Sequence, residues 1–236
     1  MHQLETIFSG IGGEFVTNPR ALAAKVNSIK AYVFDWDGVF NNSQKEGGGS
    51  SNFNEADSMG TNLLRFCHYL QYGKLPVTAI ISGEKNKTAF YLSTREHFNS
   101  SYYKTPHKVD AVDHLCKEHN LKYEEVAFVF DDVLDLSVAA ICGLRILVNR
   151  KANPLFKEHA RKNNLVDYIT GSESGNFAVR ESCELLMGLS GNYDRTVFER
   201  TNYTKEYLDY IEIRNSTPTR FFTRNERLII EADPEK

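Results

Sequence analysis

The sequence lacks the features that would place the protein in a membrane, in a secretory pathway or on nucleic acid. Its 236 residues contain no run of 18 apolar residues, so no membrane-spanning helix is expected. The stretch MHQLETIFSG has no basic segment followed by an apolar one, which argues against a signal peptide. With 28 basic and 31 acidic side chains, the net charge of −3 lacks the positive excess of nucleic-acid binders. We therefore expect a cytoplasmic protein.

Cysteine is scarce as well, and its spacing excludes a disulfide framework or a zinc site. A chain of this length can bury a full core without such cross-links. We expect reduced thiols, most of them in or near the core. The four cysteines, none of which has CxxC or zinc-ligand spacing, are Cys67, Cys116, Cys142 and Cys183.

Strand-like apolar runs alternate with helical segments along most of the chain. The predicted strands are residues 31–34, 76–81, 126–130 and 144–148. The predicted helices are residues 58–71, 84–97, 108–119, 134–141, 153–162 and 177–188. This alternation predicts βαβ units and hence an α/β fold, a doubly wound, Rossmann-like parallel sheet with helices on both faces.

The two ends of the chain fall outside this alternation. Residues 1–28 predict an N-terminal helical extension, with a helix that begins at Pro19 and has Asn18 as its N-cap. The predicted core spans residues 29–189. Residues 190–236 form an appendage that is too rich in aromatic residues for a disordered tail. We expect it to pack on its own chain or on a neighbouring subunit.

Two carboxylates follow the first apolar run directly. The segment Asp35-Trp36-Asp37-Gly38 ends this run, and Gly38 allows the backbone to turn tightly there. One carboxylate could attack as a nucleophile while the other donates or accepts a proton. A solvated acidic turn is the alternative explanation, at about even odds for an isolated motif.

A second acidic cluster follows the third predicted strand. It comprises Asp131, Asp132 and Asp135, and carboxylate oxygens of this kind suit Mg²⁺. The alternative is that one of these residues caps the following helix. An N-cap requires a single acid, so capping explains the cluster only in part.

Two weaker signals stand between the acidic motifs. Ser82-Gly83 ends the second predicted strand, where a hydroxyl and backbone N–H groups can hold a phosphate, although Ser-Gly is also a common turn. Lys108 begins a predicted helix, from which a lysine can neutralise a phosphoryl group. Most lysines are simply surface residues.

In order and spacing, these four elements resemble the motifs of the haloacid dehalogenase (HAD) superfamily. Two further segments, residues 53–60 (FNEADSMG) and 178–186 (AVRESCELL), are similar to segments of its capless subgroup, the 3-deoxy-D-manno-octulosonate 8-phosphate (KDO 8-phosphate) phosphatases. The resemblance covers about residues 28–188. It implies a HAD core without a large cap domain and a phosphatase acting on a small phosphorylated sugar or sugar acid.

The resemblance also implies roles for individual residues. Asp35 would attack phosphorus and form an aspartyl-phosphate, while Asp37 would protonate the leaving oxygen and then activate water. Mg²⁺ would lie on Asp35, the backbone carbonyl of Trp36 and Asp131, with Asp37 as an alternative ligand. In-line phosphoryl transfer requires the same set of a nucleophile, a cation and donors to the equatorial oxygens.

The remaining implied roles concern the surroundings of the metal and the phosphate. Asp132 and Asp135 would support the metal-binding carboxylates. Lys108, Ser82 and Gly83 would hold the phosphoryl oxygens.

Residues 41–52 (NNSQKEGGGSSN) have turn composition, and we expect a small β-hairpin flap over about 39–54. In this subgroup such a flap covers the site of a neighbouring subunit, so the resemblance implies a homotetramer. Asp57 and Arg180 would then contact substrate, although surface charges often have no such role.

The sequence departs from the subgroup at Phe130, Leu134 and residues 174–177, which leaves the substrate open. One alternative is a catalytically weak module kept for oligomer assembly, like the phosphatase-like domain attached to some sialic acid cytidylyltransferases. Another is a signalling receiver domain. In receiver domains the acidic pair precedes the phospho-acceptor strand, which is the reverse of the order here.

Overall fold

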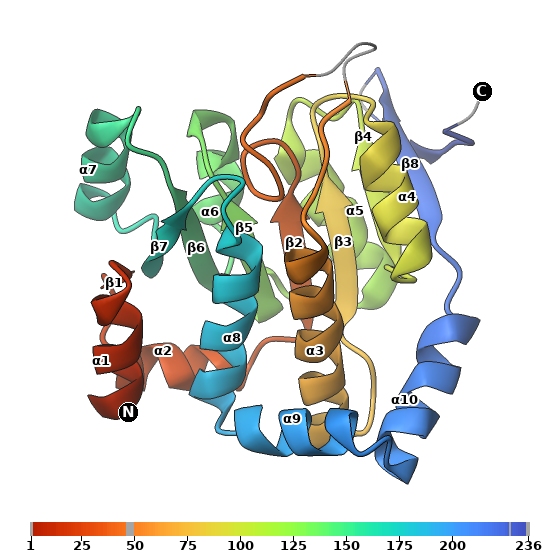
Figure 1. Cartoon of the computed structure of the whole chain (residues 1–236). Helices are drawn as coiled ribbons and strands as arrows, with labels where there is room; N and C mark the ends of the chain where they lie inside the picture. The colour runs from red at the N-terminus through yellow and green to blue at the C-terminus, as the bar shows by residue number, and fades with distance from the viewer. Residues whose placement is uncertain (1, 46–49, 227, 235–236) are drawn as a thin grey trace.

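The computed structural model describes residues 2–45, 50–226 and 228–234. In this part of the chain nine strands form one sheet, in the order β1-β7-β6-β5-β2-β3-β4-β8-β9 (Figure 1). Between β7 and β8 in this spatial order, all neighbouring strands are parallel, whereas the edge strands β1 and β9 are antiparallel to their neighbours. The strands are β1 (Glu14–Phe15), β2 (Ala31–Asp35), β3 (Val77–Ile81), β4 (Ser100–Tyr103), β5 (Val126–Phe130), β6 (Leu144–Asn149), β7 (Tyr168–Glu173), β8 (Arg220–Asn225) and β9 (Leu228–Glu231).

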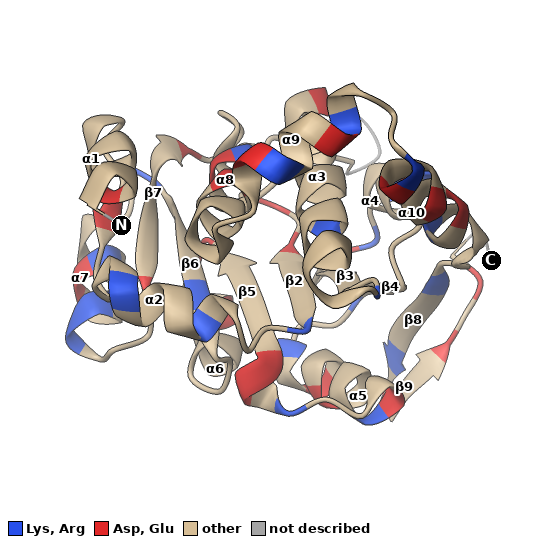
Figure 2. Cartoon of the chain, turned by 90° about the horizontal axis from the view of Figure 1, so that it is seen from below, with Lys and Arg blue, Asp and Glu red and all other residues tan. Residues whose placement is uncertain are grey.

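Helices cover both faces of the sheet, which confirms the predicted doubly wound α/β fold. In Figure 2, α3 and α8 lie on one face and α5 and α6 on the other. None of the described helices combines the length and apolar character that a membrane span needs. The helices are α1 (His2–Gly10), α2 (Pro19–Val26), α3 (Glu55–Tyr72), α4 (Lys87–Arg95), α5 (Lys108–His119), α6 (Leu136–Ala139), α7 (Pro154–Lys162), α8 (Ala178–Ser190), α9 (Tyr193–Thr201) and α10 (Lys205–Ser216).

The central strands are apolar along their whole length because both of their faces are covered. Every residue of β2 and β5 is buried. Tyr32 and Phe34 point into the core under α3 and α8, whereas Val33 and Phe128 join the core under α5. The four cysteines are free and buried, as predicted.

Two predictions about local structure have different outcomes. The Asn18 side chain accepts a hydrogen bond from the N–H of Ala21 at 3.0 Å and caps α2, as predicted. The β-hairpin flap is wrong for the described residues, because 39–45 and 50–54 contain no strand. They form a loop with turns, and the predicted tip at residues 46–49 lies outside the described part.

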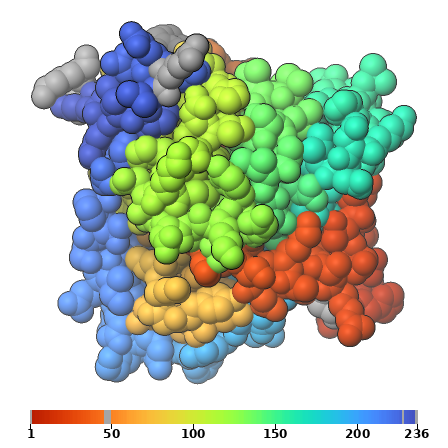
Figure 3. Space-filling model, turned by 180° about the vertical axis from the view of Figure 1, so that it is seen from behind, coloured from red at the N-terminus to blue at the C-terminus, as the bar shows by residue number. Residues whose placement is uncertain are grey.

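The appendage packs on its own chain. Tyr207 and Tyr210 on α10 form an aromatic cluster with Phe66 of α3, and the Tyr210 hydroxyl donates to the carbonyl of Asn62 at 2.9 Å. β8 then extends the sheet beyond β4. Seen from behind, this C-terminal segment lies beside α5 along one side of the core (Figure 3).

Candidate active site

The strand order reverses direction between β2 and β5, and the candidate site lies at the carboxyl ends of these two strands. From β2 the chain continues to β3 on one side, whereas β5 and β6 lie on the other. Asp35 is the last residue of β2, and Asp131 follows β5 directly. Phe34 pairs with Val129, so this parallel register brings the two carboxylates together. Ligands of open α/β sheets bind at such switch points.

Three acidic side chains converge at this point. The carboxylates of Asp35, Asp131 and Asp135 each offer an oxygen, and these oxygens lie within 4.8 Å of one another, with all three residues buried. Burial, followed by the negative charge of Asp35, raises the pKa of both Asp131 and Asp135 above the usual range. Three mutually repelling carboxylates in so small a space suit a bound cation.

The fourth acid of this region has a different role. Asp132 is exposed, and its side chain accepts a hydrogen bond from the N–H of Val133 at 2.7 Å. It caps the short 3₁₀ helix Val133–Asp135 that carries Asp135 into the site. The capping interpretation therefore holds for Asp132, while Asp131 and Asp135 join Asp35.

Lys108 provides a buried positive charge beside the three acids. It is the first residue of α5, and its Nζ lies 2.5 Å from Asp35 Oδ1 and 2.5 Å from Asp135 Oδ1. Burial alone would lower the pKa of Lys108, but the two carboxylates outweigh this effect and raise it. The lysine is therefore charged, and it fixes the orientation of the Asp35 carboxylate.

Asp37 lies at the edge of this cluster, where the loop after β2 meets solvent. Its Oδ1 accepts a hydrogen bond from Ser51 Oγ at 2.7 Å, and its Oδ2 pairs with Lys45 Nζ at 2.6 Å. Its side chain is 23% exposed, so a bound molecule can reach this carboxylate. The two donors hold it beside Asp35 on the same turn.

Gly38 is required by its close approach to the cluster. Its φ angle of +91° lies in the region that favours glycine. A Cβ atom at this position would collide with the Asp131 carboxylate and with the guanidinium of Arg150. The glycine thus allows the loop after β2 to pass directly over Asp131.

The carbonyl of Trp36 takes part in the hydrogen bonds of its own turn. It accepts hydrogen bonds from the backbone N–H groups of Val39 at 3.3 Å and Phe40 at 3.1 Å. The side-chain amide of Asn41 also donates to it, at 3.2 Å. Its role as a metal ligand stays a prediction.

Ser82 and Gly83 lie at the same edge, after β3, which is adjacent to β2. The Ser82 side chain is buried, and its Oγ accepts a hydrogen bond from the N–H of Glu84 at 3.2 Å. Its backbone N–H donates to the carbonyl of Tyr102 at 2.9 Å. The Ser82 hydroxyl hydrogen is thus available to another acceptor, and its contact with phosphate stays a prediction.

Asp57 and Arg180 do not form a surface patch. Asp57 is fully buried in α3, and its Oδ1 accepts the backbone N–H of Arg180 at 2.8 Å, near the start of α8. The Arg180 guanidinium pairs instead with Glu184 at 2.7 Å. This geometry makes Asp57 a tether between α3 and α8, and it does not support the predicted contact of Asp57 with substrate.

The buried tether has a consequence for stability. Burial raises the pKa of Asp57 to about 6 from the ordinary value of 3.8, while the hydrogen bond from Arg180 opposes the shift. Because the pKa of Asp57 is higher in the folded state, its protonated carboxyl group stabilises the fold fully below the unfolded pKa, and this stabilisation is lost as pH rises through 6.

We expect the free energy of unfolding of Asp57→Asn to increase by about 1 kcal/mol relative to that of wild type when the pH rises from about 5 to 8. Urea unfolding at both pH values measures this, and a constant difference would contradict it.

Arg150 belongs to the site although the sequence did not single it out. It follows β6, and its Nη2 lies 3.0 Å from Asp131 Oδ2. Its guanidinium also donates to Ser43 Oγ and, at 3.3 Å, to Ser174 Oγ. The Ser174 hydroxyl also lies within hydrogen-bond distance of the carbonyl of Gly38. The sequence could have indicated Arg150, because this basic residue stands two positions after the predicted strand 144–148, at the edge of the sheet where the other site residues lie.

Known proteins were compared with this chain, and no family model matches it. KDO 8-phosphate phosphatase KdsC of Escherichia coli (strain K12) is 29% identical over 175 residues, 72% of this chain and 86% of that protein. A structure described as a probable YrbI-family phosphatase from Pseudomonas syringae is 29% identical, with a TM-score of 0.64 and coverage of 76% of this chain and 97% of the other. KDO 8-phosphate phosphatase of Moraxella catarrhalis, solved with magnesium, phosphate and KDO, is 25% identical, with a TM-score of 0.64 and coverage of 78% and 99%.

The fold, the acid cluster at the switch point and these similarities agree on one class. In fold and sequence the chain is similar to HAD-type phosphatases, and the described residues contain no separate cap domain. Within that superfamily its similarity is to the KDO 8-phosphate phosphatases. About a quarter of the chain lies outside the match with the Pseudomonas syringae structure, which is itself covered almost entirely.

Proposed function

We propose that this protein is a magnesium-dependent phosphomonoester hydrolase that acts on a small phosphorylated sugar or sugar acid through an aspartyl-phosphate. The observation that carries the proposal is the buried cluster of Asp35, Asp131, Asp135 and Lys108 at the switch point. Three buried carboxylates, against the two cations Lys108 and Arg150, leave a net negative charge that fits a divalent cation. Asp35 and Asp131 would hold it, with Asp135 beside them.

The chemistry follows from where the side chains lie. Asp35 Oδ attacks phosphorus as the bond from phosphorus to the leaving oxygen breaks, and Asp37 gives its proton to that oxygen. Asp37 then takes a proton from water, which attacks phosphorus and releases Asp35. Lys108 orients Asp35, and Ser82 donates to a phosphoryl oxygen. The cation, when bound, neutralises the charge on the equatorial phosphoryl oxygens.

Similarity to KDO 8-phosphate phosphatases supports a sugar acid as the substrate. The appendage, residues 190–236, lies outside the segment that resembles the subgroup, about residues 28–188, so it can supply substrate determinants of this chain's own. The homotetramer and the cytoplasmic location stay predictions.

Phosphate release from a panel of phosphorylated sugars and sugar acids tests the proposal. With Mg²⁺ we expect turnover on the order of 1–10³ s⁻¹ for the preferred member, and with EDTA a loss of at least about 100-fold. Release that is equal in EDTA would contradict the magnesium dependence. No release from any member, while Mg²⁺ binding is detected by calorimetry, would favour the alternative of a catalytically weak assembly module.

A further inference from the structure

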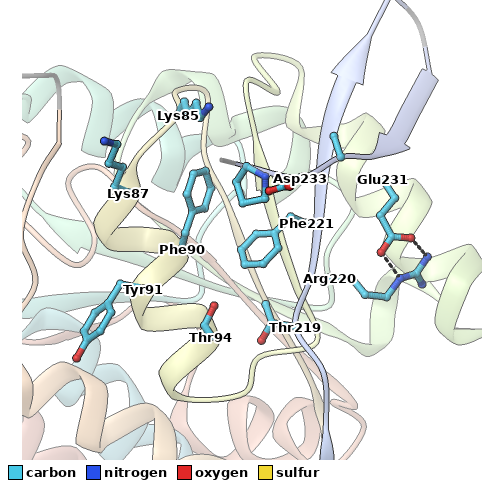
Figure 4. A pocket seen from close by; sticks show the side chains of 12 residues that line it. Lys85, Lys87, Phe90, Tyr91, Thr94, Thr219, Arg220, Phe221, Glu231 and Asp233 are labelled. Carbon is cyan, nitrogen blue, oxygen red and sulfur yellow. Dashed lines mark hydrogen bonds and ion pairs between the residues drawn. The ribbon is translucent and has the colours of Figure 1, made fainter. Parts of the chain in front are cut away.

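A groove of about 1030 Å³ lies between α4 and β8. β8 is covered by α5 on one face, where Phe222 stacks on Tyr102 at a ring-centroid distance of 5.1 Å. On its other face Phe221 packs against Phe90 on the flank of α4 (Figure 4). The appendage therefore adds a strand without adding a helix to cover this face, and the groove results.

The lining combines an aromatic floor with a cationic end. The rings of Phe90 and Phe221 meet edge to face at 5.5 Å and 84°. Lys85 and Lys87 stand at the start of α4, and neither makes an ion pair or hydrogen bond within the part of the chain that the structure describes. Ligand sites typically have such an apolar surface with a few polar groups that fix orientation.

The charge balance favours an anionic ligand. Glu231 also lines the groove, but Arg220 neutralises it through an ion pair of 2.8 Å (Figure 4). Besides this pair, the lining carries the two lysines and the Asp233 carboxylate, so its formal charge is positive. An anion entering the groove meets its favourable partners at the end where α4 begins.

That cationic end lies next to the catalytic edge. Thr88, in the first turn of α4, donates to the carbonyl of Ser51, and the Ser51 hydroxyl donates to Asp37. One loop residue thus separates α4 from the carboxyl group that protonates the leaving oxygen. The chain enters α4 directly from β3, the strand beside β2, and neighbouring strands are about 4.8 Å apart, so the start of α4 lies within the reach of a sugar acid attached to the phosphate.

From this geometry we infer that the groove binds the leaving group of the substrate, with a carboxylate of that group at Lys85 and Lys87 and its carbon skeleton against Phe90 and Phe221. This inference rests on the proposed phosphatase function and deepens it. It assigns part of the substrate selectivity to the appendage, which supplies the Phe221 wall.

The double variant Lys85→Gln/Lys87→Gln tests the inference, with KDO 8-phosphate and an aryl phosphate as substrates. We expect KM for the sugar acid phosphate to rise on the order of tenfold, while kcat/KM for the aryl phosphate, which has no carboxylate, stays within about twofold. Lys162→Gln on α7 is the matched control, exposed and remote from the groove, and it leaves both substrates unaffected. An unchanged KM, or an equal loss for both substrates, overturns the inference.

Binding of the free sugar acid separates this inference from the proposed function. Calorimetry with unphosphorylated KDO requires no catalysis, and its methyl ester provides a neutral ligand of nearly the same shape. We expect wild type to bind the acid more tightly than the ester, and the double variant to lose that preference. If wild type shows this preference but releases no phosphate, the proposed phosphatase function is refuted, while the inferred binding of the sugar acid in the groove is supported. Equal affinity of wild type for the acid and the ester refutes the inferred binding of a carboxylate in the groove.

Discussion

Asp35→Asn is expected to abolish phosphate release, lowering kcat by on the order of 10⁴-fold or more. The amide has the size of the carboxylate and can still face Lys108, but it cannot attack phosphorus. The other acids of the site are assigned to the cation or to proton transfer, so none of them can replace the nucleophile. Steady-state phosphate release with the preferred substrate of the panel measures the loss.

The intermediate provides the sharper measurement. After mixing with ³²P-labelled substrate and acid quenching, wild type is expected to carry label on the peptide that contains Asp35, and Asp35→Asn to carry none. Asp194→Asn, an exposed acid on α9, is the control and retains full activity. An active Asp35→Asn, or label found on another residue, would falsify the assignment of the nucleophile.

Lys108→Met is expected to destabilise the metal-free protein by about 3–5 kcal/mol. The lysine side chain is only 5% exposed and faces Asp35 and Asp135, so its removal leaves buried carboxylates without their cation. Methionine has a similar length and is apolar, which separates the loss of charge from the loss of volume. Urea unfolding in EDTA measures the change.

Two comparisons show whether the effect comes from charge. Lys117→Met lies on the same helix, but that side chain is 76% exposed and pairs with Asp113 at the surface, so we expect a change below about 0.5 kcal/mol. Adding Asp135→Asn to Lys108→Met removes one uncompensated carboxylate and is expected to recover part of the stability. If Lys108→Met costs no more than Lys117→Met, the buried ion pairs do not stabilise the site.

The core of the fold could be predicted because its strands are continuous apolar runs. The segments at 31–34 and 126–130 have no polar interruption, and only a strand covered on both faces requires that pattern. An aspartate follows each of them directly, so their adjacency in a parallel sheet brings Asp35 and Asp131 together. The central acids of the site thus follow from local patterns and one topological rule.

Other elements depend on tertiary contacts that no local pattern reveals. β4 has the sequence SSYY, and it is a strand because β3 and β8 pair with it. Arg150 enters the site through the turn after β6, and its approach to Asp131 requires the missing Cβ of Gly38. The hydrogen bonds that the carbonyl of Trp36 accepts within its own turn likewise cannot be read from the motif.

The pairing of β4 with β8 has a consequence for how the protein is made. Ser100 pairs with Arg220, a residue synthesised 120 positions later, so β4 leaves the ribosome long before its second neighbour exists. During that interval its backbone N–H and C=O groups present an open edge to other nascent chains. Of the proposed catalytic residues, Asp35 is translated before this interval, and Lys108 and Asp131 are translated within it. This edge of the sheet is therefore open to mispairing until residues 220–223 pair with it.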